Sequence, residues 1–129
     1  MQTQTPRQTL GLRHVALFVS KLSECVAFYT QLIGMKIVWQ PDEDNVYLST
    51  GADNFALHRA PAGAEVAKHQ RLDHIGFFLQ SAEDVDEWHA FLRSKGVEIK
   101  AAPKNHRDGT RSFYCADPDG NVVQMIYCP

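Results

Sequence analysis

The chain has 129 residues, with 13 Lys and Arg residues against 15 Asp and Glu residues and a formal net charge of −2 at pH 7. This length suits one ordinary domain, and a content of 44% apolar and 22% charged residues excludes a disordered chain. The near-neutral charge argues against a nucleic-acid partner, while the polar start and the lack of a long apolar run predict a cytoplasmic protein with no membrane partner.

Two similar segments begin the two halves of the sequence. Residues 12–19 match residues 72–79 at a constant offset of 60, and both segments have the β-branched and aromatic residues of a strand. A helical spacing of apolar residues follows each segment. Ser20 or Ser23 is the predicted N-cap of the first helix, and Ser81 is that of the second.

Short strands follow each predicted helix. Gly34 and Gly96 stand just after the helical patterns, where a left-handed residue commonly ends a helix. Turn-forming residues then separate three strand patterns in each half, and Asp-Pro-Asp-Gly at residues 117–120 predicts a tight turn. The strand patterns cover residues 35–39, 46–50 and 54–60, and then residues 97–100, 111–116 and 121–127.

Each half therefore predicts a β-α-β-β-β module. The modules cover about residues 11–60 and 72–127, with residues 61–71 as the linker. A unit of about 50–60 residues buries too little apolar surface to be stable alone, so the two are expected to share one core. The predicted fold class is α+β, with two tandem modules in a single domain of residues 1–129.

The repeat also aligns polar side chains. The offset of 60 places His14 on His74, and a shift of 66 places His58 on Gln124. If the modules pack about a pseudo-twofold axis, these four groups would converge. Imidazole and amide oxygen bind divalent metals, so the set predicts a metal site. A single histidine in a strand is more often an ordinary hydrogen-bonded residue, and the prediction depends on the coincidence of both pairs.

The two-module pattern, the histidine in each first strand and the Asp-Pro-Asp-Gly-Asn-Val-Val sequence at residues 117–123 resemble the vicinal oxygen chelate superfamily. This superfamily includes glyoxalase I, bleomycin-resistance and fosfomycin-resistance proteins and extradiol dioxygenases. The resemblance covers about residues 11–127 and implies a cupped, barrel-like mixed sheet, a small-molecule substrate and a homodimer. It implies that His14, His58 and His74 are metal ligands, with Gln124 where most metal-dependent members have Glu.

The resemblance implies a glyoxalase-like enzyme. A lyase, isomerase or transferase of this kind would act on a small oxygenated molecule whose vicinal oxygens chelate a divalent ion (Zn, Ni, Fe, Mn or Co). The implied ligand set contains no carboxylate, so the ion would keep its full charge. Two alternatives stay open: an extradiol-type ring-cleaving dioxygenase, and a metal-free binding protein similar to the bleomycin-resistance members.

A basic segment at residues 105–111 contains His106, Arg107 and Arg111. The resemblance implies that a comparable loop approaches the substrate in fosfomycin-resistance proteins. Arg107 or Arg111 would then bind a carboxylate or phosphonate, and His106 would carry a proton. The alternative is a solvated loop without a catalytic role.

Three further side chains are predicted to lie outside the site. His69, in the linker, and His89, on the second helix, are expected at the surface. Asp73 neighbours His74, and because successive strand residues point to opposite faces, we expect its carboxylate on the other side of the sheet.

Overall fold

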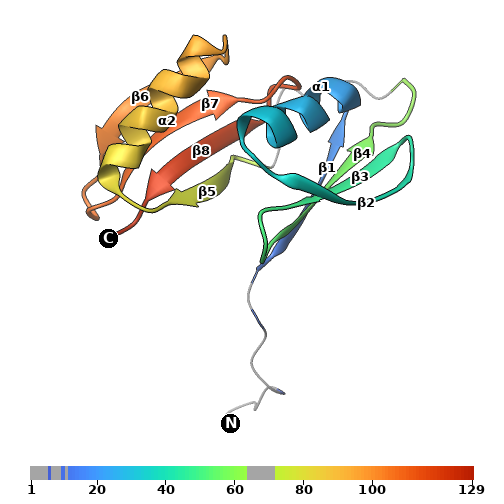
Figure 1. Cartoon of the computed structure of the whole chain (residues 1–129), viewed down its shortest axis with the longest axis horizontal. Helices are drawn as coiled ribbons and strands as arrows, with labels where there is room; N and C mark the ends of the chain where they lie inside the picture. The colour runs from blue at the N-terminus through green and yellow to red at the C-terminus, as the bar shows by residue number, and fades with distance from the viewer. Residues whose placement is uncertain (1–5, 7–9, 11, 64–71) are drawn as a thin grey trace.

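The two halves of the chain repeat one succession of elements (Figure 1). The computed structural model describes residues 6, 10, 12–63 and 72–129. The first half contains β1 (His14–Val19), α1 (Leu22–Ala27), the π-helical turn η1 (Phe28–Leu32), β2 (Lys36–Asp42), β3 (Asn45–Ser49) and β4 (Asn54–Arg59). The second half contains β5 (Ile75–Leu79), α2 (Ala82–Ser94), β6 (Ile99–Asn105), β7 (Arg111–Ala116) and β8 (Val122–Tyr127).

Each half forms its own four-stranded mixed sheet. The strand orders are β1-β4-β3-β2 and β5-β8-β7-β6, and in each sheet the first strand runs parallel to the last one. The predicted α+β fold with two tandem β-α-β-β-β modules is confirmed. Strands β2 and β6 extend beyond their predicted ends and include Pro41 and Pro103, which an outer strand tolerates because one of its edges is unpaired.

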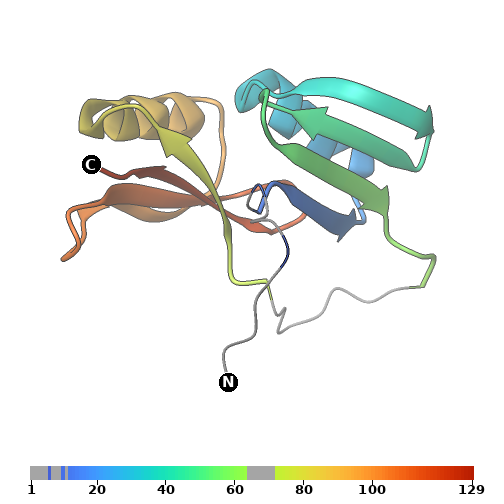
Figure 2. The ribbon, with the colours of Figure 1, turned by 90° about the horizontal axis from the view of Figure 1, so that it is seen from below.

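The helices cover one face of each sheet. In Figures 1 and 2, α2 lies across the second sheet, and α1 with η1 lies against the first. One cluster of buried side chains includes residues of both modules, with Tyr29 of η1 contacting both Phe55 of β4 and Phe77 of β5. None of the helices in the described ranges has the length and apolar composition needed to span a membrane.

The first helix takes its N-terminal acceptor from the other module. Neither Ser20 nor Ser23 caps α1 with its side chain; instead Asp119 Oδ1 accepts hydrogen bonds from the backbone N–H groups of Ser20 (3.0 Å) and Lys21 (2.9 Å). The cap of α2 is the predicted one, because the Ser81 hydroxyl accepts the backbone N–H three residues later. The Asp-Pro-Asp-Gly turn thus joins the two modules.

A buried carboxylate in the same turn makes a second connection. The Tyr29 hydroxyl donates to Asp117 Oδ2 at 2.8 Å, and burial together with the Asp117 charge raises the pKa of Tyr29. Asp117 also accepts from the backbone N–H groups of Asp119 and Asn121 and from the Asn121 side-chain amide. Four donors therefore satisfy a carboxylate that water hardly reaches.

The linker predicted over residues 61–71 lies mostly outside the described residues, as does His69. Gly34 and Gly96 both adopt positive φ angles, 95° and 78°, just after the helices that they end. A left-handed residue at these positions was expected from the sequence.

Candidate functional site

The candidate site lies on the face of the second sheet that α2 leaves uncovered, here called the open face. Gly76 of β5 lies opposite Gln124 of β8, and Gln124 lies opposite Tyr114 of β7. Strand alternation adds Ser112 to the same face. The His74 ring stands nearly perpendicular to that of Tyr114, with their centroids 5.3 Å apart. One histidine, one amide and two hydroxyls therefore converge there.

The side chain of Gln124 is held by its nitrogen. Its Nε2 donates to Ser112 Oγ (3.0 Å) and to Tyr114 Oη (3.0 Å). Its Oε1 lies beside Gly76, where an added Cβ would stand 3.6 Å away. No described residue donates to Oε1. Every fully buried side-chain nitrogen or oxygen in the described part has a partner, so an oxygen without one is not fully buried, and solvent reaches Oε1. The amide thus presents its acceptor to the open face.

The three predicted histidine ligands share one feature. In each, Nδ1 lies within hydrogen-bond distance of a side-chain oxygen. The pairs are His14 with Asn54 (2.7 Å), His58 with Asn45 (2.5 Å) and His74 with Asp73 (2.6 Å). An oxygen at Nδ1 keeps the ring proton there and leaves the Nε2 lone pair available, as is usual for metal-binding imidazoles. No sequence pattern identified the two asparagines as supports.

The position expected for Asp73 is wrong. Strand β5 begins at Ile75, so Asp73 and His74 precede it and strand alternation does not apply to them. The Asp73 carboxylate turns back to the His74 ring instead of pointing to the opposite face. A negative charge therefore stands behind this imidazole.

The strand register separates His58 from His14. His14 and His58 lie four residues apart along neighbouring strands, a separation of about 13 Å at ~3.3 Å per residue. The described residues hold no group of three or more His, Cys, Asp or Glu side chains arranged around one point.

The register also corrects the repeat alignment. Ala56 lies between Ala16 and Tyr47, as Gln124 lies between Gly76 and Tyr114. Ala56 therefore occupies the position equivalent to Gln124. His58 stands two residues further along its strand.

His58 belongs to an aromatic group on the open face of the first sheet. Its ring centroid lies 5.7 Å from that of Tyr47 and 6.2 Å from that of Phe18. Tyr47 also contacts Trp39 of the edge strand. Phe18 and Trp39 are 68% and 58% exposed, which is unusual for large apolar side chains.

The side chains of the basic segment at residues 105–111 point to different parts of the structure. His106 Nε2 lies 2.7 Å from Ser112 Oγ and so adjoins the open face of the second sheet. The Arg111 guanidinium instead faces α2, where it donates to both carboxylate oxygens of Asp86 (2.7 and 3.2 Å), and this pairing lowers the pKa of Asp86. Arg107 is exposed in the turn. His89, expected at the surface, is half-buried against Phe113.

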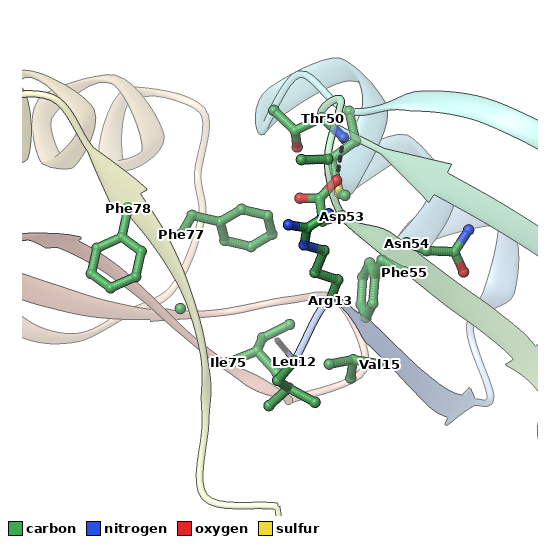
Figure 3. Close-up of a pocket in the computed structure, with 13 residues that line it drawn as sticks. Leu12, Arg13, Val15, Thr50, Asp53, Asn54, Phe55, Ile75, Phe77 and Phe78 are labelled. Carbon is green, nitrogen blue, oxygen red and sulfur yellow. Dashed lines mark hydrogen bonds between the residues drawn. The ribbon is translucent and has the colours of Figure 1, made fainter. Parts of the chain in front are cut away.

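A cavity of about 540 Å³ lies between the two modules (Figure 3). Figure 3 shows the side chains of Arg13, Phe55 and Phe77 pointing into it, whereas those of Asn54 and Phe78 point away. Asn54 and Phe78 border the cavity, but the side chains that point into it come from the faces opposite to the open ones. The open faces of one chain therefore do not enclose this space.

Two tandem β-α-β-β-β modules, each with an uncovered sheet face and a histidine at or just before its first strand, define a class of paired-module proteins. The sequence model of the Glyoxalase/Bleomycin resistance protein/Dioxygenase superfamily matches residues 11–125, and the chain belongs to this superfamily.

Individual relatives support the assignment. The chain is 28% identical over 116 residues to the metallothiol transferase FosB of Bacillus licheniformis. This match covers 90% of this chain and 74% of FosB. It is also 28% identical over 126 residues to the fosfomycin resistance protein FosX of Listeria innocua, covering 89% and 87% of the two chains. The structure of lactoylglutathione lyase from Agrobacterium tumefaciens matches with a TM-score of 0.77 at 20% identity, over 94% and 96% of the two chains.

Proposed function

We propose that the protein is a cytoplasmic, divalent-metal enzyme of transferase type whose metal site forms between two copies of the chain. The observation that carries the proposal is the placement of His74 and Gln124, which both adjoin Tyr114 on the open face of the second sheet. One polar atom of each side chain is already bonded, Nδ1 of His74 and Nε2 of Gln124, which leaves His74 Nε2 and Gln124 Oε1 as the atoms available to a metal. On the first sheet, His14 Nδ1 is likewise bonded to Asn54, which leaves His14 Nε2 available.

The donor set fits a divalent ion. Neutral imidazole and amide oxygen suit Zn, Ni, Fe, Mn or Co, and the Asp73 carboxylate behind His74 strengthens that ligand. His74 and Gln124 come from one chain, and His14 of a second copy completes the set in this proposal. His58, about 13 Å from His14, is left outside it.

A second copy would also cover exposed apolar surface. Phe18 and Trp39 on the first open face and Phe78 on the second are 68%, 58% and 77% exposed. Packing the open face of one copy's first module against that of the other copy's second module would bury these side chains and enclose the ligands. In this proposal, the cupped cavity expected from the sequence forms between the open faces of two copies in a homodimer.

The bound ion would act as a Lewis acid toward an oxygen of a small substrate. The chain's own residues bind and orient that substrate. The Tyr114 hydroxyl accepts from Gln124, so its proton is available to a substrate oxygen. Lys104 lies opposite Ser112 in the strand register and offers a positive charge for an anionic group such as a phosphonate or carboxylate. Relatives named for fosfomycin resistance support such a substrate class.

The test uses His14→Ala and His74→Ala variants purified without chelators. Each alone is expected to lose stoichiometric metal, whereas His89→Ala, which alters a histidine packed on the helix side, is expected to keep it. Mixing the two deficient variants under exchange conditions restores one complete site in each mixed dimer and about a quarter of the wild-type metal content.

Elemental analysis and light scattering read out the result. Recovery of metal on mixing supports the shared site, and no recovery refutes it. A wild-type protein that binds no divalent metal refutes the enzyme and leaves the metal-free binding protein.

A further inference from the structure

A chain of hydrogen bonds leads from the β6–β7 turn to the candidate metal ligand. His106 Nε2 lies 2.7 Å from Ser112 Oγ, and Gln124 Nε2 lies 3.0 Å from the same oxygen. The backbone holds His106 in place, because its N–H donates to the Thr110 carbonyl (2.8 Å) and its carbonyl accepts from Gly109 (3.1 Å). His106 and Ser112 lie outside the proposed donor set.

The direction of these bonds decides which end of the Gln124 amide faces the open side. An amide has an oxygen that can bind a metal and a nitrogen that cannot. Gln124 shows its oxygen only while Ser112 and Tyr114 accept from its nitrogen. If Ser112 donated to the amide instead, a half-turn of the amide would satisfy it and would place the nitrogen at the metal position.

Ser112 can accept from Gln124 only if its own proton goes elsewhere. The residue is 1% exposed, so that proton needs a partner within the protein. His106 Nε2 is the group in reach at 2.7 Å, and with its ring proton on Nδ1 it is an acceptor. The bonds then run in one direction, from Gln124 to Ser112 and from Ser112 to His106.

We propose that His106 is a positioning residue which, through Ser112, fixes the Gln124 amide with its oxygen toward the metal. The proposal rests on the proposed role of Gln124 as a ligand. A carboxylate needs no such device, since its two oxygens are equivalent. The device is therefore specific to a chain with glutamine at this position.

The test compares metal affinities by competition with a chromophoric chelator. His106→Phe removes the acceptor and is expected to weaken binding about tenfold, as loss of a supporting hydrogen bond does at other metal sites. His106→Gln, with an amide oxygen able to accept from Ser112, is expected to restore most of the affinity. His89→Phe, the same change on α2, is expected to have no effect.

The decisive comparison repeats His106→Phe in the Gln124→Glu background. There we expect the loss to fall below about twofold, because a carboxylate has no wrong orientation. An equal loss in both backgrounds would show a general structural effect and overturn the proposal.

The NMR signals of the Gln124 side-chain amide in metal-free protein give a readout independent of metal. They are expected to show two hydrogen-bonded protons in the wild type and to shift in His106→Phe; unchanged signals overturn the positioning role. If the wild type binds no metal but its Gln124 amide signals still shift in His106→Phe, the proposed function is refuted. The conclusion that His106 orients Gln124 then stands.

Discussion

Replacing Asp119 by alanine should destabilise the protein by loosening the join between its two modules. Its Oδ1 accepts the backbone N–H groups of Ser20 (3.0 Å) and Lys21 (2.9 Å) at the start of α1. Loss of a capping acceptor costs about 1 kcal/mol, and loss of a negative charge near a helix N-terminus adds ~0.5 kcal/mol. We therefore expect a decrease of about 1.5 kcal/mol in the free energy of unfolding, or about 5 °C in Tm for a chain of this size.

Urea unfolding followed by tryptophan fluorescence measures this change. Asp119→Asn keeps an acceptor oxygen without the charge and is expected to lose only part of the stability. Ser81→Ala, which removes the cap that α2 takes from its own module, is expected to cost about 1 kcal/mol. If Asp119→Ala unfolds within about 0.3 kcal/mol of the wild type, the contact does not stabilise the protein and our reasoning is wrong.

Three further predictions concern buried groups and the metal site. Tyr29→Phe leaves the buried Asp117 carboxylate with one donor fewer, so we expect a loss of about 1.5–3 kcal/mol in urea unfolding; a loss below ~0.5 kcal/mol would contradict this. Burial raises the pKa of Cys25 and of Cys115 to about 12, so at pH 8 native protein should titrate one thiol per chain, the exposed Cys128, and three after denaturation. Metal should be released as pH falls from 7 to about 5, because protonated imidazole cannot bind it; equilibrium dialysis would refute this if metal content stayed constant.

The fold was predictable because its signals are local. Ser81 and Gly96 bound α2, and the short run of apolar and β-branched residues in 122–127 marks β8, all within short windows of sequence. The cap of α1 was not predictable in this way. Its acceptor, Asp119, lies 98 residues from Lys21, and nothing near the helix indicates it.

The site was only partly predictable for a related reason. His14, His74 and Gln124 were identified from the repeat, and their roles as ligands stay predictions. The repeat misaligned His58 with Gln124 because the connections between strands differ in length in the two halves, so one fixed shift cannot follow the register. The supports at Nδ1 come from partners that only the folded sheet brings near.

The strand register makes the two modules unequal as donors. In the first sheet, Ala16 and Ala56 occupy the places that Gly76 and Gln124 have in the second. A methyl group has no lone pair, so at the equivalent positions the first module offers His14 without an amide beside it, while the second offers an imidazole and an amide together. In the proposed dimer a defect in the first module would therefore act in trans. A copy without His14 would keep its own site, provided that its partner supplies the histidine, and would disable the site of that partner.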